Sequence, residues 1–140
     1  LCAEMAEKHN AFSRFLIATD TPTGSGIMPL GMIYTISHVA SLTRLDPEIV
    51  IASATGNVAK VYGLNSGLIK QGCDGDLLIV DAPLGGTQNN ALDALKNGDP
   101  FAVGAVISSG IPRFVGRSSN TPPTLRNIKV ARSEVKEMFN

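Results

Sequence analysis

The chain has 140 residues, of which 44% are hydrophobic, and its 12 basic and 12 acidic side chains give a formal net charge of zero. This composition is that of an ordinary globular domain. The charges are interspersed and no apolar run approaches the roughly 20 residues that span a bilayer, which excludes a basic nucleic-acid-binding face and a membrane-spanning helix. We therefore expect neither nucleic acid nor a membrane as a partner.

Two cysteines, Cys2 and Cys73, are too few for a disulfide framework. Free thiols indicate a reducing compartment, so we expect a cytoplasmic protein. The sequence opens on Leu1 rather than on methionine, in the middle of a helical pattern. It therefore reads as a fragment of a longer polypeptide.

The first part of the chain predicts a helix followed by a buried strand. Residues 2–9 are helix formers and place Cys2, Met5 and Ala6 on one apolar face. Residues 15–18 form a continuous apolar run, which is typical of a strand buried on both faces of a parallel sheet. A helix followed by such a strand is the repeating unit of an α/β fold.

Two helices are predicted next. Pro29 suits the first turn of a helix that runs to residue 42. A second helix covers residues 47–63, with Asp46 as its cap, Pro47 in its first position and Gly63 at its end. Its expected buried stripe is formed by Val50, Ala54, Val58 and Val61.

Beyond residue 64 the pattern changes from helical to strand-like. Pro112 indicates that the second strand of a hairpin lies at a sheet edge or begins there. Asn90 is a suitable cap for a short helix that Gly98 ends. The expected elements are strands at 67–69, 76–81, 103–107, 113–115 and 128–131, and helices at 91–96 and 133–139.

Asp20 is the leading candidate for a functional residue. It directly follows the predicted strand 15–18, and α/β barrels place their catalytic groups at that end of a strand. A carboxylate there can bind a metal, act as a general base, or cap the following loop as an Asx turn. The residues alone leave these three roles open.

The loop that follows is a candidate substrate site. Residues 23–26, Thr-Gly-Ser-Gly, offer backbone N–H groups and hydroxyls just before a predicted helix, where a carboxylate or phosphate can bind. The loop lacks the lysine of a phosphate-binding loop and the glycine spacing of a dinucleotide site. Thr21, Thr23 and Ser25 are the candidate substrate-binding residues.

Metal-ligating residues are sparse. His9 and His38 have no partner at usable spacing, and a catalytic zinc requires about three protein ligands. Asp74 and Asp76 flank a glycine, but the other ligands of a calcium loop are missing, so a turn is expected. This chain is not expected to build a metal site alone.

A longer ordered pattern identifies a family. The segments Ala54-Thr-Gly-Asn-Val-Ala-Lys-Val-Tyr-Gly-Leu64 and Gly67-Leu-Ile-Lys-Gln-Gly-Cys-Asp-Gly-Asp-Leu-Leu-Ile-Val-Asp81 resemble the C-terminal signature of the amidohydrolase superfamily. That signature reads Thr-x-Asn-x-Ala, Gly-Leu, Gly-x-Ile, a glycine turn, and Ala-Asp-Leu before a strand. Gly75 replaces the usual alanine, a change between small residues that we expect to be harmless.

Other segments refine this resemblance. Residues 18–20, Ala-Thr-Asp, resemble the family's eighth barrel strand, whose aspartate is the shared catalytic residue. Residues 24–32 and 91–100 resemble the enamidase-like branch, which opens cyclic enamides in nicotinate breakdown. The resemblance covers almost the whole chain.

The resemblance implies an α/β fold that is the C-terminal part of a (β/α)8 metal-dependent hydrolase barrel plus part of a small β-sandwich. A complete barrel takes ~250 residues. Residues 1–63 would then be the end of the barrel, residues 64–132 the C-terminal share of the sandwich, and residues 133–140 a tail.

It also implies a small-molecule substrate, a cyclic amide and here a cyclic enamide, whose C–N bond is hydrolysed. The enzyme would be a homo-oligomer with one or two zinc or iron ions. The metal ligands would be mostly histidines outside this chain, with Asp20 as catalytic residue and metal ligand. Two alternatives stay open. One is a different amidohydrolase, similar to dihydropyrimidinase or imidazolonepropionase, and the other is a non-catalytic α/β module, if the native chain is this short.

Overall fold

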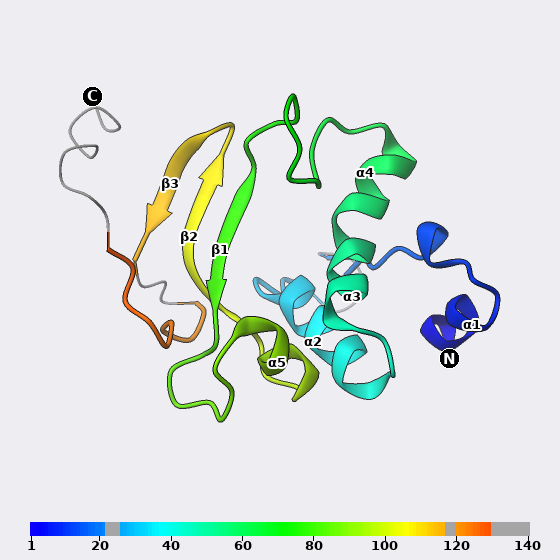
Figure 1. Ribbon diagram of the computed structural model, residues 1–140, viewed down its shortest axis with the longest axis horizontal. Coiled ribbons are helices and arrows are strands. Elements are labelled where there is room, and N and C mark those ends of the chain that lie inside the picture. Colours follow the sequence, from blue (N-terminus) through cyan, green and yellow to red (C-terminus); the bar gives the residue numbers. More distant parts are fainter. Residues whose placement is uncertain (22–25, 117–119, 130–140) are drawn as a thin grey trace.

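The computed structural model describes residues 1–21, 26–116 and 120–129. Helices gather on one side, and an antiparallel sheet lies on the other (Figure 1). No helix within the described residues is long and apolar enough to cross a membrane. The elements are α1 (Cys2–Lys8), the 3-10 helix η1 (Phe12–Arg14), α2 (Gly31–Leu42), α3 (Pro47–Ala54), α4 (Gly56–Tyr62), β1 (Leu77–Asp81), α5 (Ala91–Lys96), β2 (Ala102–Ser108) and β3 (Ile111–Val115).

Helix α1 forms where it was predicted but buries a different face. Its buried residues are Ala3 and Ala6, whereas Cys2 is exposed and Met5 is 45% exposed. The helix thus contacts the core through its smallest side chains, which allow its backbone to approach closely. The predicted face of Cys2, Met5 and Ala6 was wrong for two of its three residues.

Residues 15–18 do not form the predicted strand. They are extended, but no described residue pairs with them in a sheet, and Ala18 is exposed. Ile17 holds this segment in place: its side chain is buried, and its backbone N–H donates to the Ser53 carbonyl at 3.1 Å. A strand requires a neighbouring strand, and here the neighbour is a helix.

The two helices that were predicted next are present with changed limits. Helix α2 begins at Gly31, because Pro29 lies in a turn before it. Asp46 and Pro47 start α3 at the predicted positions, but the Asp46 side chain makes no capping hydrogen bond. The predicted helix 47–63, however, breaks at Thr55, whose φ of −128° and ψ of −89° are not helical.

This break divides the expected apolar stripe. Val50 before the break is fully buried, whereas Val61 after it is 55% exposed. Helix α4 therefore points a different face inward than a continuous helix would. Gly63 ends α4 in the left-handed conformation, with a φ of 67°, as the sequence predicted.

The sheet is an antiparallel meander in the order β1-β2-β3. Its register pairs Ile79 with Ala105 and Ser108 with Ile111. Helix α5 lies in the connection between β1 and β2, and its cap Asn90 accepts a hydrogen bond from the Asp93 N–H at 2.9 Å. The edge strand β3 contains Pro112, which confirms the edge prediction.

Two further predicted strands are wrong in the described residues. Residues 67–69 form a loop in which Ile69 is 94% exposed, because no strand lies beside it to cover it. Residues 128 and 129 are not in a strand, and the pairing occurs earlier, at an antiparallel bridge between Pro83 and Thr124. The remainder of the predicted strand 128–131 and the predicted helix 133–139 lie outside the described residues.

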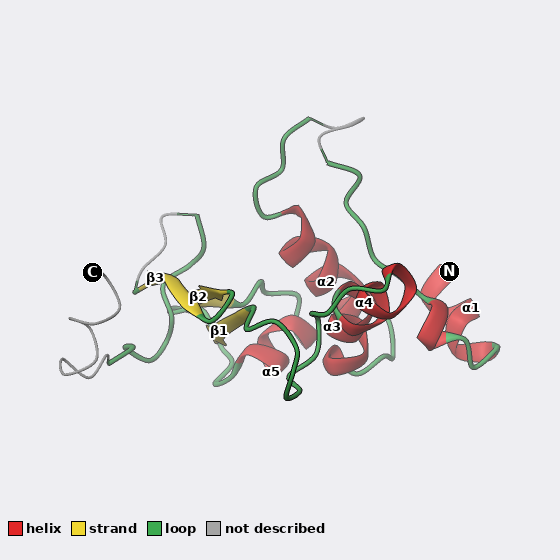
Figure 2. Ribbon diagram, turned by 90° about the horizontal axis from the view of Figure 1, so that it is seen from above, coloured by secondary structure: helices red, strands yellow, loops and turns green. Residues whose placement is uncertain are grey.

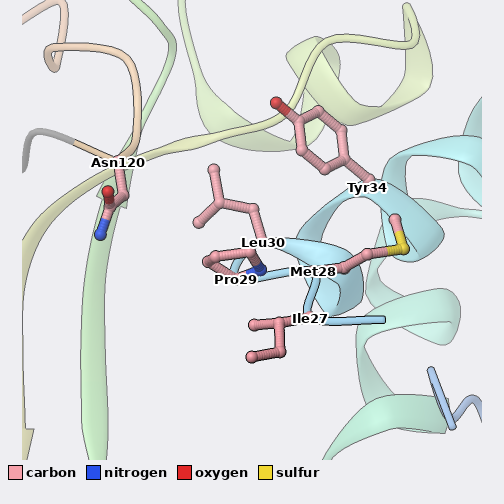
Figure 3. A pocket seen from close by; sticks show the side chains of 7 residues that line it. Ile27, Met28, Pro29, Leu30, Tyr34 and Asn120 are labelled. Carbon is pink, nitrogen blue, oxygen red and sulfur yellow. The ribbon is translucent and has the colours of Figure 1, made fainter. Parts of the chain in front are cut away.

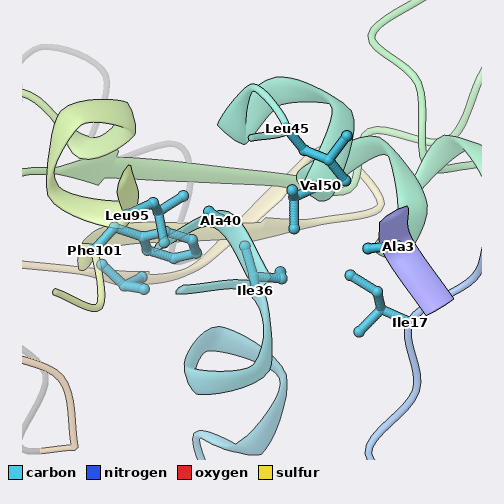
Figure 4. Close-up of a cluster of buried hydrophobic side chains, with 9 residues drawn as sticks. Ala3, Ile17, Ile36, Ala40, Leu45, Val50, Leu95 and Phe101 are labelled. Carbon is cyan, nitrogen blue, oxygen red and sulfur yellow. The ribbon is translucent and has the colours of Figure 1, made fainter. Parts of the chain in front are cut away.

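One buried apolar cluster joins the helices to the start of β2 (Figure 4). It extends across residue 63, where the sequence predicts a domain boundary, because α5 packs on α2 and α3. The boundary itself stays a prediction. The cluster contains Ala3, Ile17, Ile36, Ala40, Leu45, Val50, Leu95, Phe101 and Val103.

Candidate functional site

Asp20 lies at the end of the extended segment that follows η1. Its backbone has a φ of 52°, a left-handed conformation that aspartate tolerates better than most residues. The next residue, Thr21, donates its N–H to Thr19 Oγ1 at 3.4 Å. Asp20 is exposed, so its carboxylate is accessible to a ligand or a substrate. Of the other candidates, Thr21 is exposed, and Thr23 and Ser25 lie outside the described residues.

Three helices hold the segment that carries Asp20. The Asn57 side-chain amide of α4 donates to the carbonyls of Phe12 at 2.6 Å and Phe15 at 3.2 Å. Helix α3 accepts the hydrogen bond from Ile17. At the start of α2, a Cβ on Gly31 would lie 3.3 Å from Thr19 Cγ2, so the helix and the segment are in close contact.

The Thr-x-Asn-x-Ala signature therefore has a structural role in this chain. Thr55 stands at the break between α3 and α4, and Asn57 fixes the Asp20 segment. A Cβ on Gly67 would lie 2.9 Å from Ala59 Cβ and 2.8 Å from the Thr55 carbonyl oxygen. The signature thus packs the following loop onto α4 and orients the strand-end segment.

A shallow hollow of about 350 Å³ lies at the start of α2 (Figure 3). Its wall is mostly apolar, with the hydroxyl of Tyr34 and the amide of Asn120 as polar groups. Gly31, which contacts Thr19, also lines it, so the hollow adjoins the residue before Asp20. Residues 26–30, which lead into α2, extend away from the other helices (Figure 2). The lining residues are Ile27, Met28, Pro29, Leu30, Gly31, Tyr34 and Asn120.

An ion pair between Asp81 and Arg126, in which the Asp81 side chain is buried and the Arg126 side chain is 69% exposed, was not predicted from the sequence. Asp81 ends β1 and is only 7% exposed, and its carboxylate accepts hydrogen bonds from the Arg126 side chain, from the Arg126 N–H at 2.8 Å and from the Ala82 N–H at 2.8 Å. The side-chain bonds from Arg126 lower the pKa of Asp81 to about 2, against the opposing effect of burial. Nothing in the local pattern relates two residues 45 positions apart.

The described residues contain no group of three histidine, cysteine, aspartate or glutamate side chains that could hold a metal ion. His9, which follows α1, and His38, which lies in α2, are both exposed. The two aspartates near the glycine turn support loops, as expected. Asp74 accepts from the Asn65 amide at 3.2 Å, and Asp76 accepts from the Ser109 N–H at 2.8 Å.

Gly75, between those aspartates, is more constrained than the sequence suggested. A Cβ there would lie 2.8 Å from the Gly110 nitrogen and 2.9 Å from its Cα. Its carbonyl accepts the Gly110 N–H at 2.9 Å. Glycine is therefore required by this backbone approach, and the exchange with the family's usual alanine is not neutral in this structure.

Residues 2–117 match the model of the amidohydrolase family. The chain belongs to the amidohydrolase family. This confirms the family predicted from the segments 54–64 and 67–81. The match also extends through the Asp20 segment and the sheet.

Individual family members are similar over most of the chain. The enamidase of Eubacterium barkeri is 38% identical over 128 residues, which are 91% of this chain and 33% of the enamidase. A solved structure of enamidase, at 38% identity, matches 89% of this chain and 32% of its own with a TM-score of 0.85. A 5-methylthioadenosine/S-adenosylhomocysteine deaminase of Archaeoglobus fulgidus is 32% identical over 58% of this chain and 22% of the deaminase. The chain thus spans about a third of the enamidase's length.

Proposed function

We propose that this chain is the C-terminal third of a hydrolase that opens the C–N bond of a cyclic amide, and specifically of a cyclic enamide. The observation that supports this most directly is the 38% identity to an enamidase across 91% of the chain. An accessible carboxylate at Asp20, held by three helices, is consistent with the proposal. The substrate class and a place in nicotinate breakdown are part of this proposal.

The remaining two thirds of the enzyme would complete a (β/α)8 barrel and a small β-sandwich. Residues 15–18 would become a barrel strand when a neighbouring strand lies beside them, which their extended backbone permits. Residues 64–132 would supply part of the sandwich. Homo-oligomeric assembly and a cytoplasmic location stay predictions.

Asp20 fits a metal centre as one of its ligands. Asp20 has an accessible carboxylate, a group that binds zinc and iron, but a catalytic zinc requires about three protein ligands. The described residues supply no group of three such side chains that could hold a metal ion. The other ligands of one or two zinc or iron ions would therefore come from outside this chain.

The chemistry required is the addition of one water across an amide C–N bond. When bound, the metal would polarise the amide carbonyl and lower the pKa of the attacking water toward ~7. The Asp20 carboxylate would orient that water and accept its proton as the new C–O bond forms. The same carboxyl group would then return the proton to the ring nitrogen as the C–N bond breaks.

The proposal is tested with the purified metal-loaded holoenzyme that contains this chain. A six-membered cyclic enamide, a dihydropyrimidine and S-adenosylhomocysteine are supplied separately, and products are identified by mass. We expect only the enamide ring to open. Its product should carry the mass of one added water, or of two added waters less ammonia once the freed enamine has tautomerised and hydrolysed. Preferred turnover of the dihydropyrimidine or the adenosine compound would overturn the enamidase proposal in favour of another amidohydrolase. Turnover of none would support the non-catalytic module.

A further inference from the structure

The C-terminal described segment, residues 120–129, is fastened to the end of β1. The Leu84 N–H donates to the Pro123 carbonyl at 2.8 Å, and the Leu125 N–H donates to the Ala82 carbonyl at 2.9 Å. These bonds flank the bridge between Pro83 and Thr124. The segment thus adds a short antiparallel pairing beyond the end of β1.

The Asp81–Arg126 ion pair lies at one end of this antiparallel pairing. The Arg126 Nε donates to both carboxylate oxygens of Asp81, at 3.2 and 3.1 Å. The Arg126 Nη2 donates to Asp81 Oδ1 and also to the Asn89 carbonyl at 3.4 Å. The Arg126 side chain is 69% exposed, and exposed ion pairs contribute little stability. The Asp81 carboxylate, however, is buried and also accepts the backbone N–H groups of Ala82 and Arg126. A shift of register by one residue would leave this buried carboxylate without its partner.

The same segment begins at Asn120, which lines the hollow at the start of α2. Figure 3 shows Asn120 on the opposite side of Pro29 and Leu30 from Tyr34. Buried Thr121 follows it, so the start of the segment is packed against the protein. The position of Asn120 therefore depends on how residues 123–126 are registered against residues 81–84.

We propose that Asp81 and Arg126 form a latch that sets the register of this segment, and so positions Asn120 as a substrate-binding residue in the wall of the hollow. The assignment of a substrate to the hollow rests on the proposed function, and the choice of Asn120 rests on its place as a polar residue in a mostly apolar wall. Asp81 and Arg126 are positioning residues, because they act through the segment.

The latch is tested in the holoenzyme with Arg126→Lys, which keeps the charge but cannot reproduce a planar, multidentate contact. Hydrogen exchange of residues 124–126 should accelerate by roughly tenfold, because bonds to a charged group are weakened. Arg113→Gln, on the exposed side of β3, is the matched control and should leave exchange unchanged. Unchanged protection in Arg126→Lys would overturn the latch.

The role of Asn120 is tested separately, by steady-state kinetics. Arg126→Lys and Asn120→Ala should each raise KM for the cyclic enamide several-fold with kcat changed less than twofold, and only Arg126→Lys should alter exchange. An unchanged KM in both variants would remove Asn120 from the substrate site even if the latch holds. If the wild-type enzyme does not hydrolyse the enamide, the proposed function fails, and hydrogen exchange still decides the latch.

Discussion

At the scale of single residues, the proposed function depends most on the side chain of Asp20. If it transfers the proton of the attacking water, Asp20→Asn in the full-length holoenzyme keeps the shape but removes the base. We expect kcat to fall by roughly 10²–10⁴-fold, the usual contribution of general acid–base catalysis. The measurement is steady-state hydrolysis together with metal content.

The neighbouring Thr21→Val is the control, because the contact seen for Thr21 uses its backbone N–H rather than its side chain. It should keep most of the turnover. Near-normal turnover in Asp20→Asn would contradict the mechanism. Loss of metal with a collapsed melting transition would make Asp20 chiefly a structural ligand, and the base would then be another residue.

Position 75 requires glycine because another backbone segment lies beside it, not because the residue has a chemical role. Gly75→Ala forces its Cβ against the backbone of Gly110, and we expect a destabilisation of about 1–3 kcal/mol, typical of overpacking. Gly56→Ala is the matched control. Its Cβ would meet the movable end of the Leu68 side chain at 2.9 Å, at a helical position where alanine is favoured. Equal urea midpoints for both variants would refute this constraint.

Asp81 makes stability depend on pH in the acid range. Its pKa in the folded protein, about 2, lies below its ordinary value of 3.8, so the folded state favours the ionised carboxylate. The resulting stabilisation is complete above pH ~4 and is lost as the pH falls toward 2. Asp81→Asn should therefore lose less stability than the wild type between pH 4 and pH 2, measured by urea unfolding at each pH. Parallel losses in both proteins would contradict this linkage.

At the scale of elements, the important joint lies between α4 and the Asp20 segment. Asn57→Ala removes two hydrogen bonds to the carbonyls of Phe12 and Phe15, and each buried bond contributes about 0.5–1.5 kcal/mol. We expect a loss of about 1–3 kcal/mol in urea unfolding, together with a lower kcat, because the strand-end carboxylate is no longer oriented. Asn127→Ala, at an exposed position, is the control. Full activity and stability in Asn57→Ala would show that the other helices suffice.

At the scale of the whole molecule, β1 is an edge strand with exposed apolar side chains. Leu77, Leu78 and Ile79 are 38%, 55% and 49% exposed, so apolar side chains are exposed to solvent on both faces of the strand. An edge of this kind pairs with other chains unless it is covered. We expect the 140-residue chain alone to associate, measured by light scattering after size exclusion. A monodisperse monomer that melts cooperatively would count against the proposal that further strands of the enzyme cover β1.

The sequence by itself determined the family and most of the local structure. The cap and proline at Asp46 and Pro47, the glycine stop at Gly63 and the Asn90 cap act within a few residues, so their signals are complete in the local sequence. The ordered spacing from residue 54 to residue 81 identified the amidohydrolase family, because these residues pack on one another and on the Asp20 segment. It also directed attention to Asp20, whose role remains a proposal.

The tertiary structure alone decided which apolar runs are covered and which distant residues meet. Residues 15–18 and 67–69 have strand-like sequences, but a strand exists only beside a partner, and the described residues provide none for them. The register of the C-terminal segment depends on the Asp81–Arg126 pair, and the need for glycine at Gly75 depends on the approach of Gly110. These contacts join residues that are 35 and 45 positions apart. The sequence around one residue of each pair predicts the same local structure whether or not the other residue is present.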